Sequence, residues 1–162
     1  MDWDAIGAVG EILGALAVVA TLVYLARQVN YARTEAADAN RLSRANGLRD
    51  WNLAVMTNNE LRDTITKSHH LQPYFQAYAE ELEISVDDAA RSEWSNAYFF
   101  WLHWGQWSTT NDEEGRAELE RMIRSYYAVP AVRYSWDNSP YGKHIFQTRF
   151  VEYVDNILMN LR

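Results

Sequence analysis

The chain has 162 residues, of which 48% are hydrophobic, and it contains seven Trp and ten Tyr. This composition excludes a disordered chain, because disordered segments carry too few apolar residues to form a core. The formal net charge of −7, without a clustered basic face, argues against nucleic-acid binding. The absence of Cys excludes disulfides, zinc-thiolate sites and thiol nucleophiles, and fits a reducing compartment. The length suits one soluble domain and one membrane element.

The chain starts with an apolar run from Ile6 to Ala26, in which Glu11 and Tyr24 are the only ionisable side chains. A helix of about 20 apolar residues is long enough to cross the hydrocarbon layer of a membrane. A cleaved signal peptide is not expected, because the run follows the acidic stretch MDWD and no polar cleavage segment comes after it. A buried helix of a soluble protein is the alternative, but such helices rarely have so long an apolar run. We therefore predict a transmembrane segment within residues 1–28.

The charges on either side of the apolar run predict its orientation. Asp2 and Asp4 precede it, whereas the residues that follow it include five arginines: Arg27, Arg33, Arg41, Arg44 and Arg49. Basic residues are retained on the cytoplasmic side of a membrane. The expected location is the bacterial inner membrane, crossed once, with the N-terminus outside and the C-terminal domain in the cytoplasm.

Small residues recur along one side of the predicted transmembrane helix. At 100° per residue this side carries Gly7, Gly10, Gly14, Ala17 and Thr21, and larger apolar residues occupy the opposite side. Membrane helices associate where small residues allow their backbones to approach closely, and Gly10 and Gly14 form a GxxxG pair. The pattern predicts a homo-oligomer that is packed through this glycine face.

A second series of residues starts at Glu11, passes through Val18 and continues to Ala39 in alternating steps of four and three residues. This 3.5-residue period predicts that the helix extends from the membrane through residues 29–57 and takes part in a left-handed helical assembly. An alanine-rich helix with accidental spacing is the alternative. In the helical assembly, Glu11 would face neighbouring helices. It would serve either as a polar contact that reaches a hydrogen-bond partner or water, or as an ion or proton site.

Residues 58–162 are expected to form a compact cytoplasmic domain, and the whole chain is predicted to be all-α because no convincing strand pattern occurs. Asn58 and Asn59 should end the long helix and cap the next one, and Ser85 and Asn111 or Asp112 should cap later helices. Helices are expected at NELRDTITKSHH, at about 87–107 and within NDEEGRAELERMIRSYY, and a short aromatic segment from Pro73 to Glu83 is expected after the first of them. The segment VPAVRYSWDNSPYGK is interpreted as a connector anchored by Trp136. A last helix, from about Gly142 to Leu161, should follow it.

The helix at residues 87–107 carries aromatic residues around most of its circumference, Trp101 among them. A helix that is apolar nearly all round is usually the buried centre of a domain. These residues are therefore predicted to form the core, with His103 as a hydrogen-bonded core histidine. A binding surface is the alternative, because tryptophan is also enriched at interfaces.

No linear motif of catalysis or metal binding is present. None of the four histidines stands in an HExxH or Glu-x-x-His arrangement, and the chain has no GxGxxG, P-loop or GxSxG sequence. We therefore expect no catalytic residue, metal ligand or cofactor. An active site without a linear motif is the alternative.

The segment DWDAIGAVGEILGALAVVATLVYLARQVN, with VRYSWDN and FVEYVDNIL later in the chain, resembles a family of uncharacterised bacterial single-pass membrane proteins. The resemblance covers nearly the whole chain and is most specific over residues 3–28. It implies a W-x-A-I-G-A-x-G-E-I-x-G-A transmembrane segment followed by a helical cytoplasmic tail, and it implies no particular activity.

These patterns predict a homo-oligomeric membrane assembly or scaffold whose partners are the lipid bilayer and further copies of the chain. One alternative is an ion-conducting oligomer in which Glu11 lines the outer mouth of a channel. Another is an accessory subunit that binds a different membrane protein in a larger complex.

Overall fold

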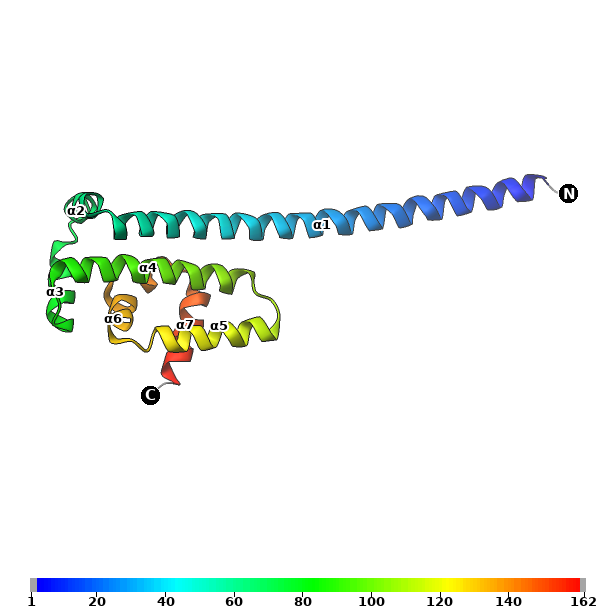
Figure 1. Ribbon diagram of the computed structural model, residues 1–162. Helices are drawn as coiled ribbons and strands as arrows, with labels where there is room; N and C mark the ends of the chain where they lie inside the picture. Colours follow the sequence, from blue (N-terminus) through cyan, green and yellow to red (C-terminus); the bar gives the residue numbers. More distant parts are fainter. Residues whose placement is uncertain (1–2, 161–162) are drawn as a thin grey trace. The chain divides into compact units, whose positions relative to one another are not determined.

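The computed structural model describes residues 3–160, and for residues 4–6 it describes the backbone alone. This part of the chain forms seven α-helices and one short 3-10 helix and contains no strand, which confirms the all-α prediction (Figure 1). The expectations placed on Asp2 and Leu161 concern residues outside the described range. The chain divides into two compact units, residues 1–40 and 41–162.

Helix α1 runs without interruption from Trp3 to Thr57. The continuation of the apolar helix into a long polar one is therefore confirmed. The helix ends where the sequence predicted, because the side chain of Asn58 accepts a hydrogen bond from the backbone N–H of Leu61 at 3.0 Å. This capping interaction starts helix α2 (Asn59–Ser68).

The unit at residues 41–162 contains the end of α1 and all later elements. After α2 come α3 (Gln72–Leu82), α4 (Val86–Thr109) and α5 (Glu113–Tyr126). The predicted caps are confirmed, since Ser85 Oγ accepts from the N–H of Asp88 and an Asp112 carboxylate oxygen accepts from the N–H of Gly115. The chain then forms α6 (Pro130–Asn138), the 3-10 helix η1 (Lys143–Ile145) and α7 (Thr148–Met159).

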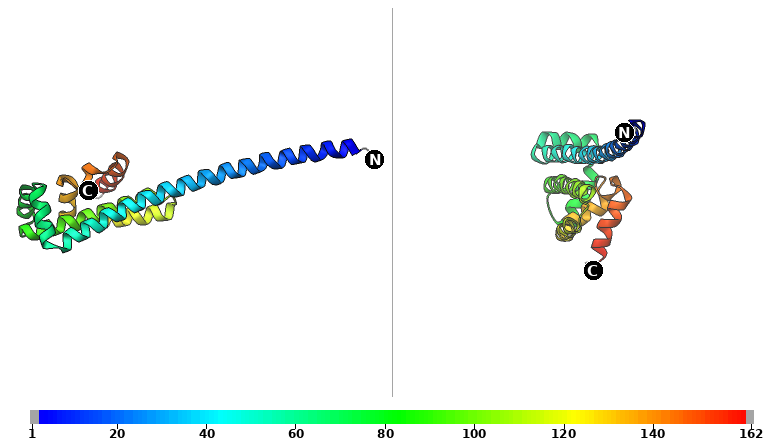
Figure 2. Two further views of the ribbon diagram at one scale, coloured as in Figure 1. Left: turned by 90° about the horizontal axis from the view of Figure 1, so that it is seen from above. Right: turned by 90° about the vertical axis from the view of Figure 1, so that its right-hand side faces the viewer.

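Helix α4 is the centre of this unit. It packs against α3, α5 and α6, and α7 packs against α5. Helices α4 and α5 run antiparallel (Figure 1), and the right-hand view of Figure 2 shows α7, in red, crossing them steeply. No residue of α4 from Ala89 onward is exposed, which confirms the prediction that this aromatic helix is the core of the domain.

The core consists of three clusters, each of which includes residues of α4, and it is largely aromatic. Trp94, Phe100 and Trp136 are buried, and Phe100 and Trp136 meet edge to face with ring centroids 5.1 Å apart. Trp101 is only half-buried and packs against the outside of this core.

The end of α1 belongs to this core as well. Ala45 is buried, and a Cβ atom added to Gly105 of α4 would lie 3.3 Å from the Ala45 Cβ. A short side chain at each position therefore lets the two helices approach closely. Arg49, one turn further along α1, donates a hydrogen bond to the Tyr98 hydroxyl at 2.8 Å. The compact unit thus starts at Arg41, within the segment that the sequence suggested as a helical extension.

Two expectations for the C-terminal region were wrong. The segment interpreted as a connector contains helix α6, because Pro130 stands in its first turn, where proline is favoured, and Val132, Ser135 and Trp136 form a buried helical face. The last helix starts at Thr148 and not near Gly142. Gly142 lies against backbone carbonyls of α6, and Phe146 is extended, so a continuous α-helix cannot run through this stretch.

Candidate functional site

The sequence-predicted site lies on the apolar part of α1. This helix contains a stretch that is long and apolar enough to cross a membrane, and none of that stretch is buried within the chain. Large apolar side chains on it are about half exposed or more, for example Ile12 at 61% and Leu22 at 60%. In water such an unpartnered apolar surface would be unfavourable. The stretch is therefore a candidate membrane span.

The glycines of the predicted face have no packing role within the chain. A Cβ atom added to Gly7, Gly10 or Gly14 would meet no other atom within 4 Å. Intrachain packing thus gives no reason for a glycine at any of these positions. Gly105 and Gly142 differ, because neighbouring atoms of the chain approach both of them closely.

The other residues of the predicted interface are also exposed on α1. Ala17 and Val18 are both exposed on α1, and Val18 is 59% exposed. The Thr21 hydroxyl donates a hydrogen bond to the Ala17 carbonyl at 2.8 Å. Thr21 is therefore satisfied within its own helix and offers a small, largely apolar surface to a neighbour.

Glu11 is exposed on α1, next to the glycine face. No hydrogen bond or ion pair joins it to another side chain in the described part of the chain. Its carboxylate is thus available to water, to a lipid headgroup or to another copy of the chain. The structure places all seven predicted interface residues on one helix but shows no partner helix.

The residues that could bind a metal ion are scattered. Among the described residues, no three His, Asp or Glu side chains lie close enough together to hold a metal ion. His69 pairs with the Tyr141 hydroxyl at 2.5 Å through Nδ1. His144 is exposed.

His103 departs from its expected role. It is buried between α4 and α5 and contacts the rings of Phe99, Tyr126 and Tyr127, as a core histidine should. Its Nδ1 atom, however, is buried without a hydrogen-bond partner. Burial lowers the pKa of His103 to about 4, so the ring is neutral at pH 7.

Sequence reasoning missed Glu93, the most deeply buried acid of the chain. Its carboxylate accepts hydrogen bonds from the Tyr74 hydroxyl at 2.6 Å, from the Ser135 hydroxyl at 2.7 Å and from the Ser139 hydroxyl. Burial raises the pKa of Glu93 despite these three donors. The carboxylate joins α3, α4 and the end of α6, and its neighbours leave it no open side for a substrate. Its role is to hold these helices together.

A signal for Glu93 was present in the sequence. It is the last charged residue before an uncharged stretch that continues to Asn111. It also lies on the helical face of Ala89, Ala97 and Phe100, at spacings of four and three residues. An acid that is buried on such a face needs hydrogen-bond donors around its carboxylate. These donors come from α3 and the end of α6, and no local sequence pattern connects either region to α4.

Comparison with known proteins adds no further information on the site. No protein-family model, curated protein or solved structure matches the chain significantly.

Proposed function

We propose that this protein is a single-pass membrane scaffold that assembles with further copies of itself through the glycine face of α1. The observation that carries the proposal is the set of three glycines, Gly7, Gly10 and Gly14, on an exposed apolar helix that gives them no packing role within the chain.

The glycines have an energetic cost that association would offset. Each glycine in a helix interior is about 1 kcal/mol less favourable than alanine. Contact with lipid gives no reason to accept this cost at three positions on one side. A neighbouring helix does, because glycine allows the two backbones to approach and form extensive van der Waals contact.

The proposed location is the bacterial inner membrane, with the N-terminus outside and the helical unit in the cytoplasm. The arginines after the apolar run support this orientation. In this arrangement α1 brings several copies of the helical unit together at the membrane surface.

The proposal is tested by Gly10→Leu and Gly14→Leu in the full chain, reconstituted in bilayers. A leucine should prevent close helix contact and convert the oligomer to a monomer, as measured by cross-linking or by single-molecule photobleaching. Ala8→Leu is the matched control, because it adds the same side chain at a similar depth on the opposite side of the helix. Equal oligomer size in all three variants would refute the glycine interface.

An ion-conducting oligomer is a second candidate function, and the exposed Glu11 is the observation that favours it. In an assembly packed through the glycine face, one Glu11 from each copy would lie near the bundle interior. A ring of carboxylates there would attract cations.

A further inference from the structure

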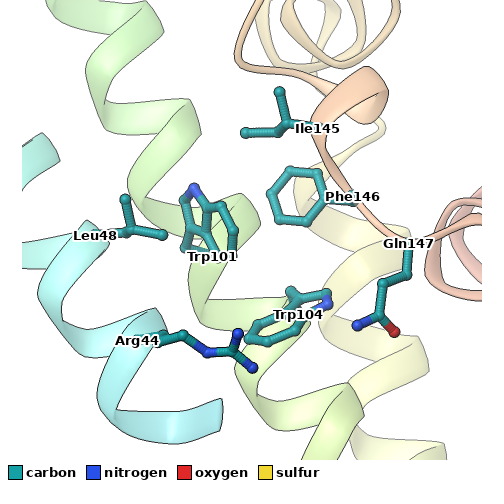
Figure 3. Close-up of a pocket in the computed structure, with 7 residues that line it drawn as sticks. All are labelled: Arg44, Leu48, Trp101, Trp104, Ile145, Phe146 and Gln147. Carbon is teal, nitrogen blue, oxygen red and sulfur yellow. The ribbon is translucent and has the colours of Figure 1, made fainter. Parts of the chain in front are cut away.

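A cavity of about 200 Å³ lies in the helical unit, between the end of α1, α4 and the stretch before α7 (Figure 3). Its lining residues come from three separate parts of the chain. They are Arg44 and Leu48 of α1, Trp101 and Trp104 of α4, Ile145 of η1, and Phe146 and Gln147.

The apolar part of the cavity is built from rings that already pack against one another. Trp101 contacts Trp104 edge to face with centroids 5.3 Å apart, and it contacts Phe146 with centroids 4.7 Å apart. Leu48 and Ile145 complete this part, and both are partly exposed at its mouth. Because the rings support one another, an apolar ligand would enter a preformed site and would not have to order it.

The polar groups of the cavity are gathered at one end. Figure 3 shows the Arg44 guanidinium and the Gln147 amide on either side of Trp104, away from Ile145. Arg62, Arg91, Arg124 and Arg133 each pair with an acid of the helical unit. Arg44 is exposed and forms no ion pair or hydrogen bond with any described residue. Its charge is therefore available to a ligand.

We propose that this cavity binds a small amphipathic carboxylate. The aromatic walls receive an apolar body, and the Arg44 guanidinium pairs with the carboxylate while the Gln147 amide donates a further hydrogen bond. Guanidinium is well suited to this role because its planar donors match the two oxygens of a carboxylate. The ligand would contact α1, which is also the helix that carries the predicted membrane segment.

The size of the cavity limits the ligand. Cavities for drug-sized molecules measure about 300–1,000 Å³, so this one accommodates a body of about a single ring or a short branched chain. A larger hollow of about 650 Å³ lies between α4 and α5, but it is more open. Its charged residues, Glu118 and Arg121, are of opposite sign, so it does not select for an anion.

The test uses the full chain in lipid nanodiscs and three ligands in a ligand-observed NMR titration, with empty nanodiscs as the blank. Phenylacetate has both the ring and the carboxylate, phenylacetamide has the same shape without the charge, and acetate has the charge without the ring. Phenylacetate should bind saturably. The other two should bind at least about fivefold more weakly, because each lacks one of the two interactions.

Substitutions in the chain show where phenylacetate binds. Arg44→Gln should weaken phenylacetate about fivefold to tenfold and leave phenylacetamide nearly unchanged, since a charge-assisted hydrogen bond is lost at an exposed position. Arg33→Gln removes the same charge from α1 outside the cavity and should have no effect. Ile145→Trp changes an exposed side chain at the mouth and should weaken both ring-containing ligands.

Each result decides the proposal. Weaker phenylacetate binding in Arg44→Gln but not in Arg33→Gln supports it. The absence of saturable phenylacetate binding, or equal affinity of the parent and Arg44→Gln, would overturn it. Loss of binding in Arg121→Gln in place of Arg44→Gln would also overturn it, because the ligand would then occupy the hollow between α4 and α5.

Discussion

Two titratable side chains of α4 are buried, and they respond to pH in opposite ways. Burial lowers the pKa of His103 to about 4 and raises the pKa of Glu93. Each shift favours the neutral form of its group. Relative to the unfolded chain, folding therefore disfavours the charged form of each side chain. The stability that His103 contributes is lost as the pH falls, and the stability that Glu93 contributes is lost as the pH rises.

The His103 shift predicts a loss of stability in acid. Between the ordinary pKa of histidine and about 4, the unfolded chain binds a proton that the folded chain does not. The contribution of His103 to the free energy of unfolding should therefore fall by about 3 kcal/mol as the pH falls from about 6.5 to 4. His103→Gln should remove this dependence in denaturant titrations followed by tryptophan fluorescence, because six of the seven tryptophans lie in residues 41–162.

The parent must be compared with the variant at each pH, because Glu93 acts in the opposite direction. Its raised pKa contributes stability that is present at low pH and is lost as the pH rises through the folded value. The difference between parent and variant cancels this contribution. His144→Gln, at an exposed position, is the control, and an identical pH dependence in parent and His103→Gln would contradict the prediction.

Glu11 distinguishes the scaffold from the channel. Glu11→Gln keeps the shape and hydrogen-bonding capacity of the side chain but removes its charge. For a scaffold we expect an unchanged oligomer size and no conductance of reconstituted bilayers, with or without the substitution. Cation-selective current from the parent that is lost in Glu11→Gln would instead favour the channel, because a ring of neutral amides attracts cations far less than a ring of carboxylates.

At the scale of elements, the junction between α6 and η1 depends on the small size of Gly142. A Cβ atom added there would lie 2.6 Å from the carbonyl oxygens of Ser135 and Trp136. Backbone atoms cannot move aside as a flexible side chain can. This close approach lets the chain leave α6 and bring Phe146 back against Trp136, with ring centroids 5.9 Å apart.

Gly142→Ala should therefore destabilise the helical unit by about 1–3 kcal/mol, as overpacking of a close contact does. The free energy of unfolding by denaturant measures the effect. Gly47→Ala is the matched control, because a Cβ at this position on α1 would meet nothing within 4 Å. That variant should be stabilised by about 0.5–1 kcal/mol through helix propensity. A Gly142→Ala variant as stable as the parent would show that the junction tolerates a side chain.

At the scale of the whole molecule, the distribution of charge around the apolar run predicts the topology. A reporter fused after Arg162 should be active in the cytoplasm, because the arginines that follow the run are retained on that side. Paired reporters, one active only in the cytoplasm and one only in the periplasm, measure this directly. Activity of the periplasmic reporter alone would reverse the proposed orientation.

The sequence by itself determined the features that depend on local chemistry. The all-α class, the end of α1 at Thr57 and the caps at Ser85 and Asp112 follow from residue periodicity and from side chains that bond to nearby backbone groups. The long apolar run before residue 27 is also recognisable from the sequence, because it is identified by its length and composition alone.

The tertiary structure alone decided which distant side chains meet. Glu93 is satisfied by hydroxyls that lie 19 to 46 residues away along the chain. Arg44 lines a cavity with Phe146, which comes from the far end of the domain. Helix α6 was not predicted from the sequence, because a proline such as Pro130 occurs both in turns and at the start of helices. Only the packing of this segment against α4 selects the helix. Such contacts depend on how the helices pack, and packing is a property of the whole core that no local spacing encodes.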